Sequence, residues 1–457
     1  MFKPLEDIIL GKKILILGFG REGKALFAFL RKKYPNLVIW IADRNVELKS
    51  IQEIDPSFDN QLISGEAYLD SLRDFDLVVK TPGIPLISIE GKMDMTKLTS
   101  QTNLFLKLFR NQVIGITGTK GKSTTSSLIY HIVKQFTDDV VLVGNIGVPP
   151  FEVIELLKPS TKIVFELSSH QLESVDVSPH ISILLNIYQE HLDHYKSFLD
   201  YQMAKYKIAQ FQLPGDYIIY NNEDERITEL MRLMPLKSTA LGFGYEFHTK
   251  SSAWFEKEDA IIKPQIDTVP ITIHKTTGIQ LKGNHNLLNA MAAVLAVKTF
   301  GLPEQLILKA VASFKGLEHR IEYVGCYNHR HFYNDSISTI PEASVLAIRA
   351  LGRVDTLLLG GKDRGIDYEP LVQHLIQSPI QGLVFTGNAG QRMMDHLQEA
   401  GYKGLMLFFE EFDAMVEYAK SITPADGVCL LSPAASSYDR FINFEERGKR
   451  FKMLVSK

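Results

Sequence analysis

A glycine-rich stretch, GITGTKGKST at residues 115–124, constrains the fold more than any other part of this chain. It follows an apolar segment, Val113–Ile116, that is typical of a buried strand, and it leads into Ser123–Gln135, which has apolar residues at helical spacing. A glycine-rich turn between a strand and a helix directs backbone N–H groups at a phosphate. The usual spacing of a phosphate loop would place the first glycine at position 116, where this chain has isoleucine. The neighbourhood nevertheless predicts a phosphate-binding loop in an α/β domain.

A second turn of this kind lies near the N-terminus. Lys12–Leu17 predicts a short buried strand, and GFGREG at residues 18–23 follows it directly, ahead of a helical stretch. A second strand, Leu37–Ile41, precedes Asp43, which gives the GxGxxG arrangement of Rossmann-type nucleotide-binding units. A tight turn without a ligand has the same sequence, so this pattern alone leaves both interpretations open.

The order of these segments predicts three α/β domains. We expect a Rossmann-like domain at 1–98, a central phosphate-loop domain with a mostly parallel sheet at 99–315, and a Rossmann-like domain at 316–457. A further helix is expected at 285–300. Additional strands are predicted at Asp76–Lys80, Thr161–Leu167, Ile181–Ile187, Thr356–Leu359, Gly382–Phe385 and Gly427–Leu431.

Composition excludes several classes of protein. A chain of 457 residues with 45% hydrophobic and 23% charged residues is typical of a soluble globular protein. Its 50 basic and 53 acidic residues nearly cancel, which argues against a nucleic-acid partner. Only two cysteines, Cys326 and Cys429, are present, and no apolar run has the length of a membrane span or the character of a signal peptide. We therefore expect a cytoplasmic protein.

Polar residues follow two more predicted strands of the central domain. Glu166 closes one strand, and Glu190, His191 and Asp193 come shortly after the next. The carboxyl ends of parallel strands meet at one edge of a sheet, so these groups should lie beside the phosphate loop. A carboxylate and a neutral imidazole there predict a divalent metal site. The structural alternatives are a helix cap for Glu166 and a hydrogen-bonded core position for His191.

Lys205 lies in a helical segment, YQMAKYKI, shortly after His191. A lysine on a helix is usually exposed to solvent. Near bound metal and phosphate, however, neighbouring cations would lower its pKa. A neutral amine can add CO₂ and become an anionic carbamate, and whether Lys205 does so depends on the motifs described next.

Several motifs together resemble the Mur ligase family, the ATP-dependent amide ligases of peptidoglycan precursor synthesis. They occur in the expected order over essentially the whole chain: TGTKGKST, ELSSHQLE, HLDHY followed by AKYKI, GNHNLLNA, LEHRIE, NDS and LLSPAASS. The shifted glycine of the phosphate loop is normal for this family. GFGREG with Asp43-Arg44, KTPGIP, GGKDRGIDY and SPAASSYDRFINFEERG resemble the branch that adds D-glutamate to UDP-N-acetylmuramoyl-L-alanine.

The resemblance implies ATP and two Mg²⁺ ions as cofactors, and a monomer without a membrane or nucleic-acid partner. Catalysis is assigned to Lys122, Glu166, His191 and Lys205. ATP contacts are assigned to Gly118, Thr119, Lys120, Gly121, Lys122, Ser123, Thr124, Asn286, Asn289, Arg320 and Asp335. Metal ligands are Ser123, Glu166, His191 and Lys205 as its carbamate. The UDP substrate is assigned to Gly18, Phe19, Gly20, Asp43, Arg44, Thr81, Pro82, Gly83, Asn145, Ser168 and Gln171, and the glutamate acceptor to Thr339, Arg364, Ser437 and Phe444.

Four residues depart from the family pattern. His170 replaces a phenylalanine, Glu190 replaces an aspartate, and Arg364 replaces the lysine of some members. Ile337 replaces a lysine near the acceptor site, which removes a cation and leaves both D- and L-glutamate open as acceptors. Three other functions also stay open at this stage: a nicotinamide-dependent oxidoreductase, a nucleotide-dependent binding protein without ligase activity, and another Mur-type ligase.

Overall fold

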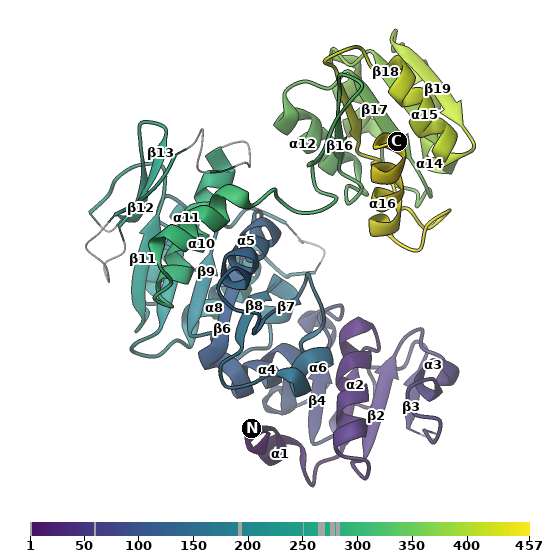
Figure 1. Cartoon of the computed structure of the whole chain (residues 1–457). Coiled ribbons are helices and arrows are strands. Elements are labelled where there is room, and N and C mark those ends of the chain that lie inside the picture. Colours follow the sequence, from purple (N-terminus) through teal and green to yellow (C-terminus); the bar gives the residue numbers. More distant parts are fainter. Residues whose placement is uncertain are drawn as a thin grey trace. The chain divides into compact units, whose positions relative to one another are not determined.

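The computed structural model describes residues 2–58, 61–190, 194–249, 251–263, 270–274, 279 and 284–457. These residues form three sheets, and the chain divides into two compact units, of which the second is Lys315–Lys457 (Figure 1). The predicted α/β class with mostly parallel sheets is confirmed. The two boundaries between the three predicted domains stay a prediction, and strand β5, Leu98–Ser100, lies across the first of them. Among the described residues, no helix has the length and apolar character needed to cross a membrane.

The first sheet is parallel throughout and has the strand order β3-β2-β1-β4-β5. The chain first builds outward on one side of β1 and then returns to its other side with β4. The loops that follow β1 and β4 therefore face each other at the carboxyl edge, where ligands bind in folds of this kind. The elements are α1 (Lys3–Ile9), β1 (Ile14–Leu17), α2 (Arg21–Lys33), β2 (Ile39–Asp43), α3 (Leu48–Gln52), β3 (Leu62–Ser64), β4 (Leu77–Lys80), β5 and α4 (Gln101–Phe109).

The second sheet has the order β14-β13-β12-β11-β10-β9-β6-β8-β7. Strands β6 to β12 are parallel, while β13 and β14 extend the sheet beyond β12 through antiparallel pairings. The predicted strands around Glu166 and before Glu190 are confirmed as β8 and β9, the two neighbours of β6. The strands are β6 (Val113–Thr117), β7 (Val140–Gly144), β8 (Lys162–Glu166), β9 (Ile181–Leu184), β10 (Tyr217–Asn221), β11 (Thr239–Phe243), β12 (Ser251–Glu256), β13 (Asp259–Ile262) and β14 (Ile271–Ile273).

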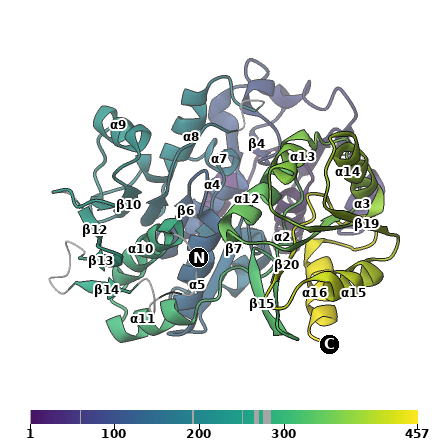
Figure 2. The same cartoon turned by 90° about the horizontal axis from the view of Figure 1, so that it is seen from above.

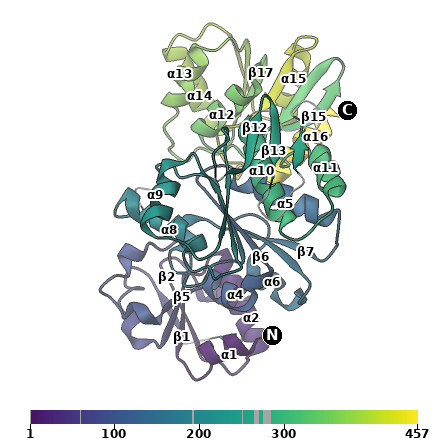
Figure 3. The ribbon, with the colours of Figure 1, turned by 90° about the vertical axis from the view of Figure 1, so that its left-hand side faces the viewer.

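Helices cover both faces of this second sheet. On one face α5 packs over β6 to β8, and α10 lies beside it over β9 to β13 (Figure 3). On the other face α8 packs against β6 and β9. The helices of this region are α5 (Lys122–Lys134), α6 (Pro150–Val153), α7 (Ser169–Leu172), α8 (Phe198–Gln210), α9 (Glu225–Leu233), α10 (Asn284–Lys298) and α11 (Glu304–Ser313).

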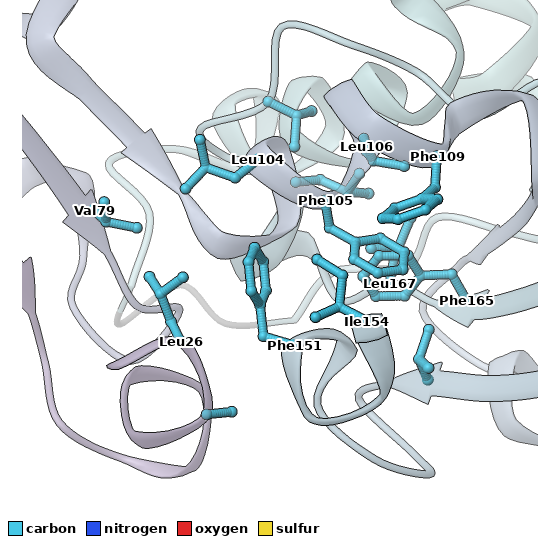
Figure 4. Close-up of a cluster of buried hydrophobic side chains, with 14 of the residues drawn as sticks. Leu26, Val79, Leu104, Phe105, Leu106, Phe109, Phe151, Ile154, Phe165 and Leu167 are labelled. Atoms are coloured by element: carbon cyan, nitrogen blue, oxygen red, sulfur yellow. The ribbon is translucent and has the colours of Figure 1, made fainter. Parts of the chain in front are cut away.

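The first two sheets share one hydrophobic core, which explains why they form a single compact unit. Phe105 of α4 lies between the two sheets, with its ring centroid 6.3 Å from Phe151 of α6 and 5.6 Å from Phe165 of β8 (Figure 4). Leu26 of α2 and Val79 of β4 extend the cluster toward the first sheet (Figure 4). All five side chains are almost fully buried, so separating the sheets would expose a large apolar surface to water.

The second unit contains the third sheet, with the order β15-β16-β20-β17-β18-β19. All its pairings are parallel except that of β15 with β16. Helices α12 to α14 cover one face, and α15 and α16 cover the other (Figure 2). The elements are β15 (Glu322–Tyr327), β16 (Arg330–Asn334), α12 (Pro341–Leu351), β17 (Thr356–Gly360), α13 (Glu369–Ile376), β18 (Gly382–Thr386), α14 (Gly387–Glu399), β19 (Leu405–Phe409), α15 (Phe412–Ile422), β20 (Val428–Leu431) and α16 (Phe444–Val455).

Candidate active site

A pocket of about 430 Å³ lies at the carboxyl edge of the first sheet. Seven of the residues predicted for the UDP substrate line it: Gly18, Gly20, Asp43, Arg44, Thr81, Pro82 and Gly83. Arg21, Glu22, Tyr68 and Ile84 complete the lining. Phe19, which was also predicted, does not line the pocket: its ring is buried in the core against Phe27, and its backbone N–H group donates to Asp43.

The turn after β1 brings the start of α2 into this pocket. Gly18 has φ +96°, and a Cβ atom at this position would lie 1.9 Å from the hydroxyl oxygen of Thr81, so only glycine fits there. Gly20 is the N-cap of α2 and provides no side-chain hydrogen bond to the helix. The amides of the first helical turn are therefore available to an anionic group such as a diphosphate.

Asp43 fixes the shape of the pocket. Its Oδ2 atom accepts a hydrogen bond of 2.7 Å from the Phe19 backbone, and its Oδ1 atom accepts one of 3.0 Å from Asn45. The carboxylate thus joins the glycine turn after β1 to the end of β2. Arg44 forms an exposed ion pair with Glu66, with 2.6 Å between Nη2 and Oε1. Exposed pairs of this kind contribute little to stability, so Arg44 can exchange its partner for a phosphate at small cost.

The phosphate loop meets α5 and α10 at Gly121. This residue is the N-cap of α5, has φ +84° and forms no side-chain cap. A Cβ atom at Gly121 would lie 2.5 Å from Oδ1 of Asn289 in α10. Nδ2 of Asn289 is in turn 3.4 Å from Oδ1 of Asn286. The structure therefore brings both predicted asparagines to the start of α5, where Ser123 and Thr124 occupy the first turn.

The segment after β9 fixes the conformation of the phosphate loop. Backbone N–H of Thr119 donates to the carbonyl of Asn186 at 2.9 Å, and its hydroxyl accepts from Tyr188 N–H at 2.8 Å. The Asn186 side chain binds both main-chain groups of Lys120, accepting at 2.8 Å and donating at 3.1 Å. The Lys120 side chain pairs with Glu190. Asn186 was not predicted, although its place directly after a central strand was a usable signal.

Two lysines converge on one carbonyl group of the loop. Nζ of Lys122 donates to the carbonyls of Gly118 and Thr119 at 2.9 Å, and Nζ of Lys205 donates to the same Gly118 carbonyl at 2.9 Å. Lys205 is 2% exposed, so the solvated-helix alternative is wrong. Burial lowers the pKa of Lys205 well below its ordinary value, and the positive charge of Lys122 lowers it further. A neutral amine at this place is the chemical requirement for carbamate formation.

Glu166 has the environment of a metal ligand. It is fully buried at the end of β8, and its Oε1 atom accepts a hydrogen bond of 2.7 Å from Asn145. Among the residues that the structure describes, Oε2 of Glu166 has no hydrogen-bond partner. A buried, unsatisfied carboxylate oxygen is costly unless a cation binds it. The alternative role of Glu166 as a helix cap is wrong, because Ser168 caps α7.

The oxygen-rich donor set fits Mg²⁺. Glu166 would supply a carboxylate, Ser123 a hydroxyl and Lys205, if carbamylated, a further anionic oxygen, and these are the ligand types that this ion prefers. His191 and Asp193 lie outside the described residues, so the predicted imidazole ligand is not placed. Within the described part of the chain, no group of three or more His, Cys, Asp or Glu side chains has the geometry of a metal site. The predicted set does not require such a group, because serine and lysine provide two of its ligands.

Ser168 and Gln171 connect the start of α7 to the pocket of the first sheet. They form a reciprocal capping box at the start of α7, in which the Ser168 hydroxyl accepts from Gln171 N–H and the Gln171 side chain accepts from Ser168 N–H. Nε2 of Gln171 also donates to Glu22 of α2 at 2.6 Å. Burial raises the pKa of the Glu22 carboxyl. Glu22 lines the pocket but was not predicted, because a glutamate in the first turn of a helix is unremarkable in sequence.

In the second unit, Asp335 is held at the end of β16. Its Oδ1 atom accepts from Ile321 N–H at 3.2 Å, and its Oδ2 atom accepts from the Ser432 hydroxyl at 2.7 Å. Burial raises the pKa of the Asp335 carboxyl to about 6. Arg320 is exposed, and its neighbours His319 and Ile321 have φ values of 63° and 45°. Such values are uncommon for these residues and give the segment around Arg320 one defined conformation.

The residues predicted for the amino-acid acceptor come from loops at one edge of the third sheet. Thr339 follows β16, Arg364 follows β17, and Ser437 follows β20. Phe444 begins α16, and its carbonyl accepts a hydrogen bond of 2.8 Å from the Ser336 hydroxyl in the loop after β16. Ser437 is buried, whereas Arg364 is exposed.

Arg447 organises these loops and was missed by the sequence analysis. Its guanidinium is buried and donates to the Ser336 hydroxyl at 2.9 Å, to the Ser336 carbonyl at 2.8 Å and to the Ala435 carbonyl at 3.0 Å. Burial lowers the pKa of Arg447 to about 10. The residue belongs to the FEERG motif of α16, one turn after Phe444. Its place in this motif was the only feature of the sequence that pointed to a role for Arg447.

Comparison with known proteins identifies the family. The family model described as the Mur ligase middle domain matches residues 116–297, which include the phosphate loop, Glu166 and Lys205. A UDP-N-acetylmuramoylalanine–D-glutamate ligase of Acetivibrio thermocellus is 32% identical over 98% of this chain and 97% of its own length. The chain belongs to the Mur ligase family. The ligase of the same name from Desulfitobacterium hafniense is 33% identical over 97% of both chains.

Solved structures of Mur ligases share the fold. The UDP-N-acetylmuramate-alanine ligase MurC from Thermotoga maritima matches 98% of this chain and 100% of its own, with 19% identity and a TM-score of 0.56. The MurF ligase of Thermotoga maritima, solved in complex with ADP, matches 97% of this chain and 95% of its own, with 15% identity and a TM-score of 0.54. Membership of the Mur ligase family does not favour the oxidoreductase alternative for the GxGxxG turn.

Proposed function

We propose that this chain is an ATP-dependent ligase that joins D-glutamate to UDP-N-acetylmuramoyl-L-alanine in peptidoglycan precursor synthesis. The observation that carries the proposal is buried Lys205, which shares the Gly118 carbonyl of the phosphate loop with Lys122. A protein that only binds nucleotide has no need of a second, desolvated lysine at this place. The relatives named as D-glutamate ligases support the choice of substrates.

The reaction needs an activated carboxylate. In the proposed first step, a carboxylate oxygen of the UDP substrate attacks the γ-phosphorus of ATP, and the bond between that phosphorus and the ADP oxygen breaks. In the second step, the amine of glutamate attacks the carbonyl carbon of the acyl phosphate, loses a proton and expels inorganic phosphate. Mg²⁺, when bound, would neutralise charge on the transferred phosphoryl group.

Residues of the first compact unit supply the groups for the phosphoryl transfer. Lys122 is placed to move from the loop carbonyls to the terminal phosphates, and the free amides at the start of α5 would bind the same oxygens. Ser123, Glu166 and carbamylated Lys205 would hold Mg²⁺. The pocket at Gly18, Gly20 and Thr81–Gly83 would hold the UDP group, because α2 directs uncapped amides toward it.

For the acceptor, we propose that Arg364 binds a carboxylate of glutamate, with Thr339 and Ser437 donating hydrogen bonds and Phe444 closing the pocket. A charge-assisted hydrogen bond contributes roughly 1.5–3 kcal/mol, so Arg364→Ala should raise the KM for glutamate about tenfold or more. Arg353→Ala is the matched control, since this exposed arginine precedes β17 at the opposite edge of the same sheet. An unchanged glutamate KM in Arg364→Ala would refute this pocket.

The proposed activity is tested by release of phosphate from ATP with UDP-N-acetylmuramoyl-L-alanine and a panel of D- and L-amino acids. We expect turnover with D-glutamate and none without the UDP substrate. Ile337, where a lysine is usual, makes L-glutamate the most informative second acceptor. Turnover with L-glutamate alone would refute the stereochemistry, and the absence of turnover with every amino acid would refute the ligase activity.

A further inference from the structure

A buried ion pair joins the first sheet to the carboxyl edge of the second. Lys80 is the last residue of β4, and Glu173 directly follows α7, with 3.0 Å between Nζ and Oε2. The two side chains are only 1% and 3% exposed. The free energy lost when such a pair is removed from water is offset only when further hydrogen bonds satisfy both partners. The positions of those further bonds indicate what the pair does.

The other bonds of Lys80 reach the turn that lines the nucleotide pocket. Its Nζ atom donates to the carbonyl of Ile84 at 2.8 Å and to that of Thr81 at 3.3 Å. These two residues flank Pro82 and Gly83, and all four line the pocket. Lys80 itself does not line it. The ammonium group therefore holds the turn at both ends from its buried side.

Glu173 is fixed on its other side by His194. Oε1 of Glu173 lies 2.6 Å from Nε2 of His194, and the His194 ring is 4.0 Å from the ring of His170 in α7. Lys207 of α8 binds the backbone carbonyl of Glu173. The carboxylate that faces Lys80 is thus held by His194, from the segment before α8, whereas Lys207 contacts only the backbone of Glu173. This arrangement gives the turn at Thr81–Ile84 a fixed attachment to the region that follows Glu166.

We propose that Lys80 is a positioning residue for the UDP-substrate pocket, and that it acts by holding the turn at Thr81–Ile84 while Glu173 fixes its ammonium group. The inference rests on the proposed function, which assigns the UDP group to this pocket. Without the ammonium group, the carbonyls of Thr81 and Ile84 lose their common donor, and the turn no longer has one conformation matched to the ligand. Binding of the UDP substrate then weakens, while the phosphate loop keeps its own hydrogen bonds to Asn186.

The test compares two ways of removing the ammonium group. Lys80→Met keeps the side-chain volume but leaves Glu173 buried without its partner, which threatens folding. The double variant Lys80→Met/Glu173→Met replaces the ion pair by two apolar side chains of similar size, an exchange that buried pairs often tolerate. The matched control is Lys207→Met, which removes a donor to Glu173 without any bond to the turn.

The measurements are KM for each substrate and direct calorimetric binding of UDP. In both Lys80 variants we expect UDP to bind at least tenfold more weakly and KM for UDP-N-acetylmuramoyl-L-alanine to rise to the same degree. KM for ATP and glutamate should change less than twofold, and Lys207→Met should resemble the wild type. Equal weakening for all substrates would show a merely structural role and overturn the inference, as would unchanged UDP binding in a folded variant. A wild-type protein that binds no UDP would refute the proposed function itself, and the inference with it.

Discussion

The buried carboxyl of Asp335 makes the stability of the second unit depend on pH in a predictable direction. Burial raises the pKa of this group from 3.8 to about 6, so between these values the folded state holds a proton that the unfolded chain has released. Stability should therefore fall as the pH rises through this window and stay constant above it. Each pH unit corresponds to about 1.4 kcal/mol, so a shift of roughly two units predicts a loss of about 3 kcal/mol.

Asp335→Asn removes the titration and keeps the shape. The asparagine can accept from Ile321 N–H and donate to Ser432, whose hydroxyl is 2.9 Å from that of Ser344 and can reorient. Relative to the wild type, the variant should gain about 3 kcal/mol in free energy of unfolding between pH 4 and pH 7.

Urea unfolding followed by far-UV circular dichroism measures this difference. Trp40 and Trp254 both belong to the first compact unit, so their fluorescence provides an internal reference that the substitution should not change. Parallel pH profiles for the wild type and Asp335→Asn would show that the carboxyl does not titrate in this window and would refute the reasoning.

Three further predictions concern the phosphate loop. Lys122→Ala should lower kcat on the order of a hundredfold or more, because it removes the cation proposed for the terminal phosphates, and UDP binding by calorimetry should stay normal. Near-normal turnover in the folded variant would contradict the assignment. Gly121→Ala places a Cβ atom 2.5 Å from the Asn289 oxygen and forces alanine to φ +84°, which costs about 1–2 kcal/mol of backbone strain. We expect a lower Tm and a higher KM for ATP, and an unchanged KM for ATP would argue against contact of Gly121 with the nucleotide. Lys205→Ala should be nearly inactive, and short-chain carboxylic acids should restore activity by replacing the carbamate; full activity in CO₂-depleted buffer would exclude this role.

The sequence predicts the parts of this fold that depend on local pattern. Strands such as β6 and β8 are buried on both faces, so they appear as continuous apolar runs that end at polar site residues. The antiparallel strands β12 and β13 lie close to the edge strand β14, where partial exposure mixes polar and apolar residues, and they were not predicted. The common core of the first two sheets depends on which aromatic residues meet in space, and spacing along the chain carries no such information.

In the candidate site, too, some residues are placed by local pattern and others by contacts between distant parts of the chain. Gly121 and Lys122 owe their positions to one turn and its helix, and Glu166 owes its position to the end of a parallel strand, so motif and topology suffice for all three. Lys80 and Glu173 are 93 residues apart and meet only because the two sheets pack together. A lysine that ends a strand and a glutamate that follows a helix are each ordinary in sequence. Their pairing could be found only from the folded structure.

The core shared by the first two sheets has a consequence for substrate selection. Phe105, Phe151 and Phe165 join the sheets, so the pocket at Gly18 and the phosphate loop at Gly121 belong to one body rather than to two hinged ones. The distance between the pocket and the phosphate loop is therefore fixed. In the proposed function, a nucleotide-linked substrate would place its carboxylate at the γ-phosphate only if its own length matched that distance, and shorter or longer analogues would be rejected although each of their ends could still bind.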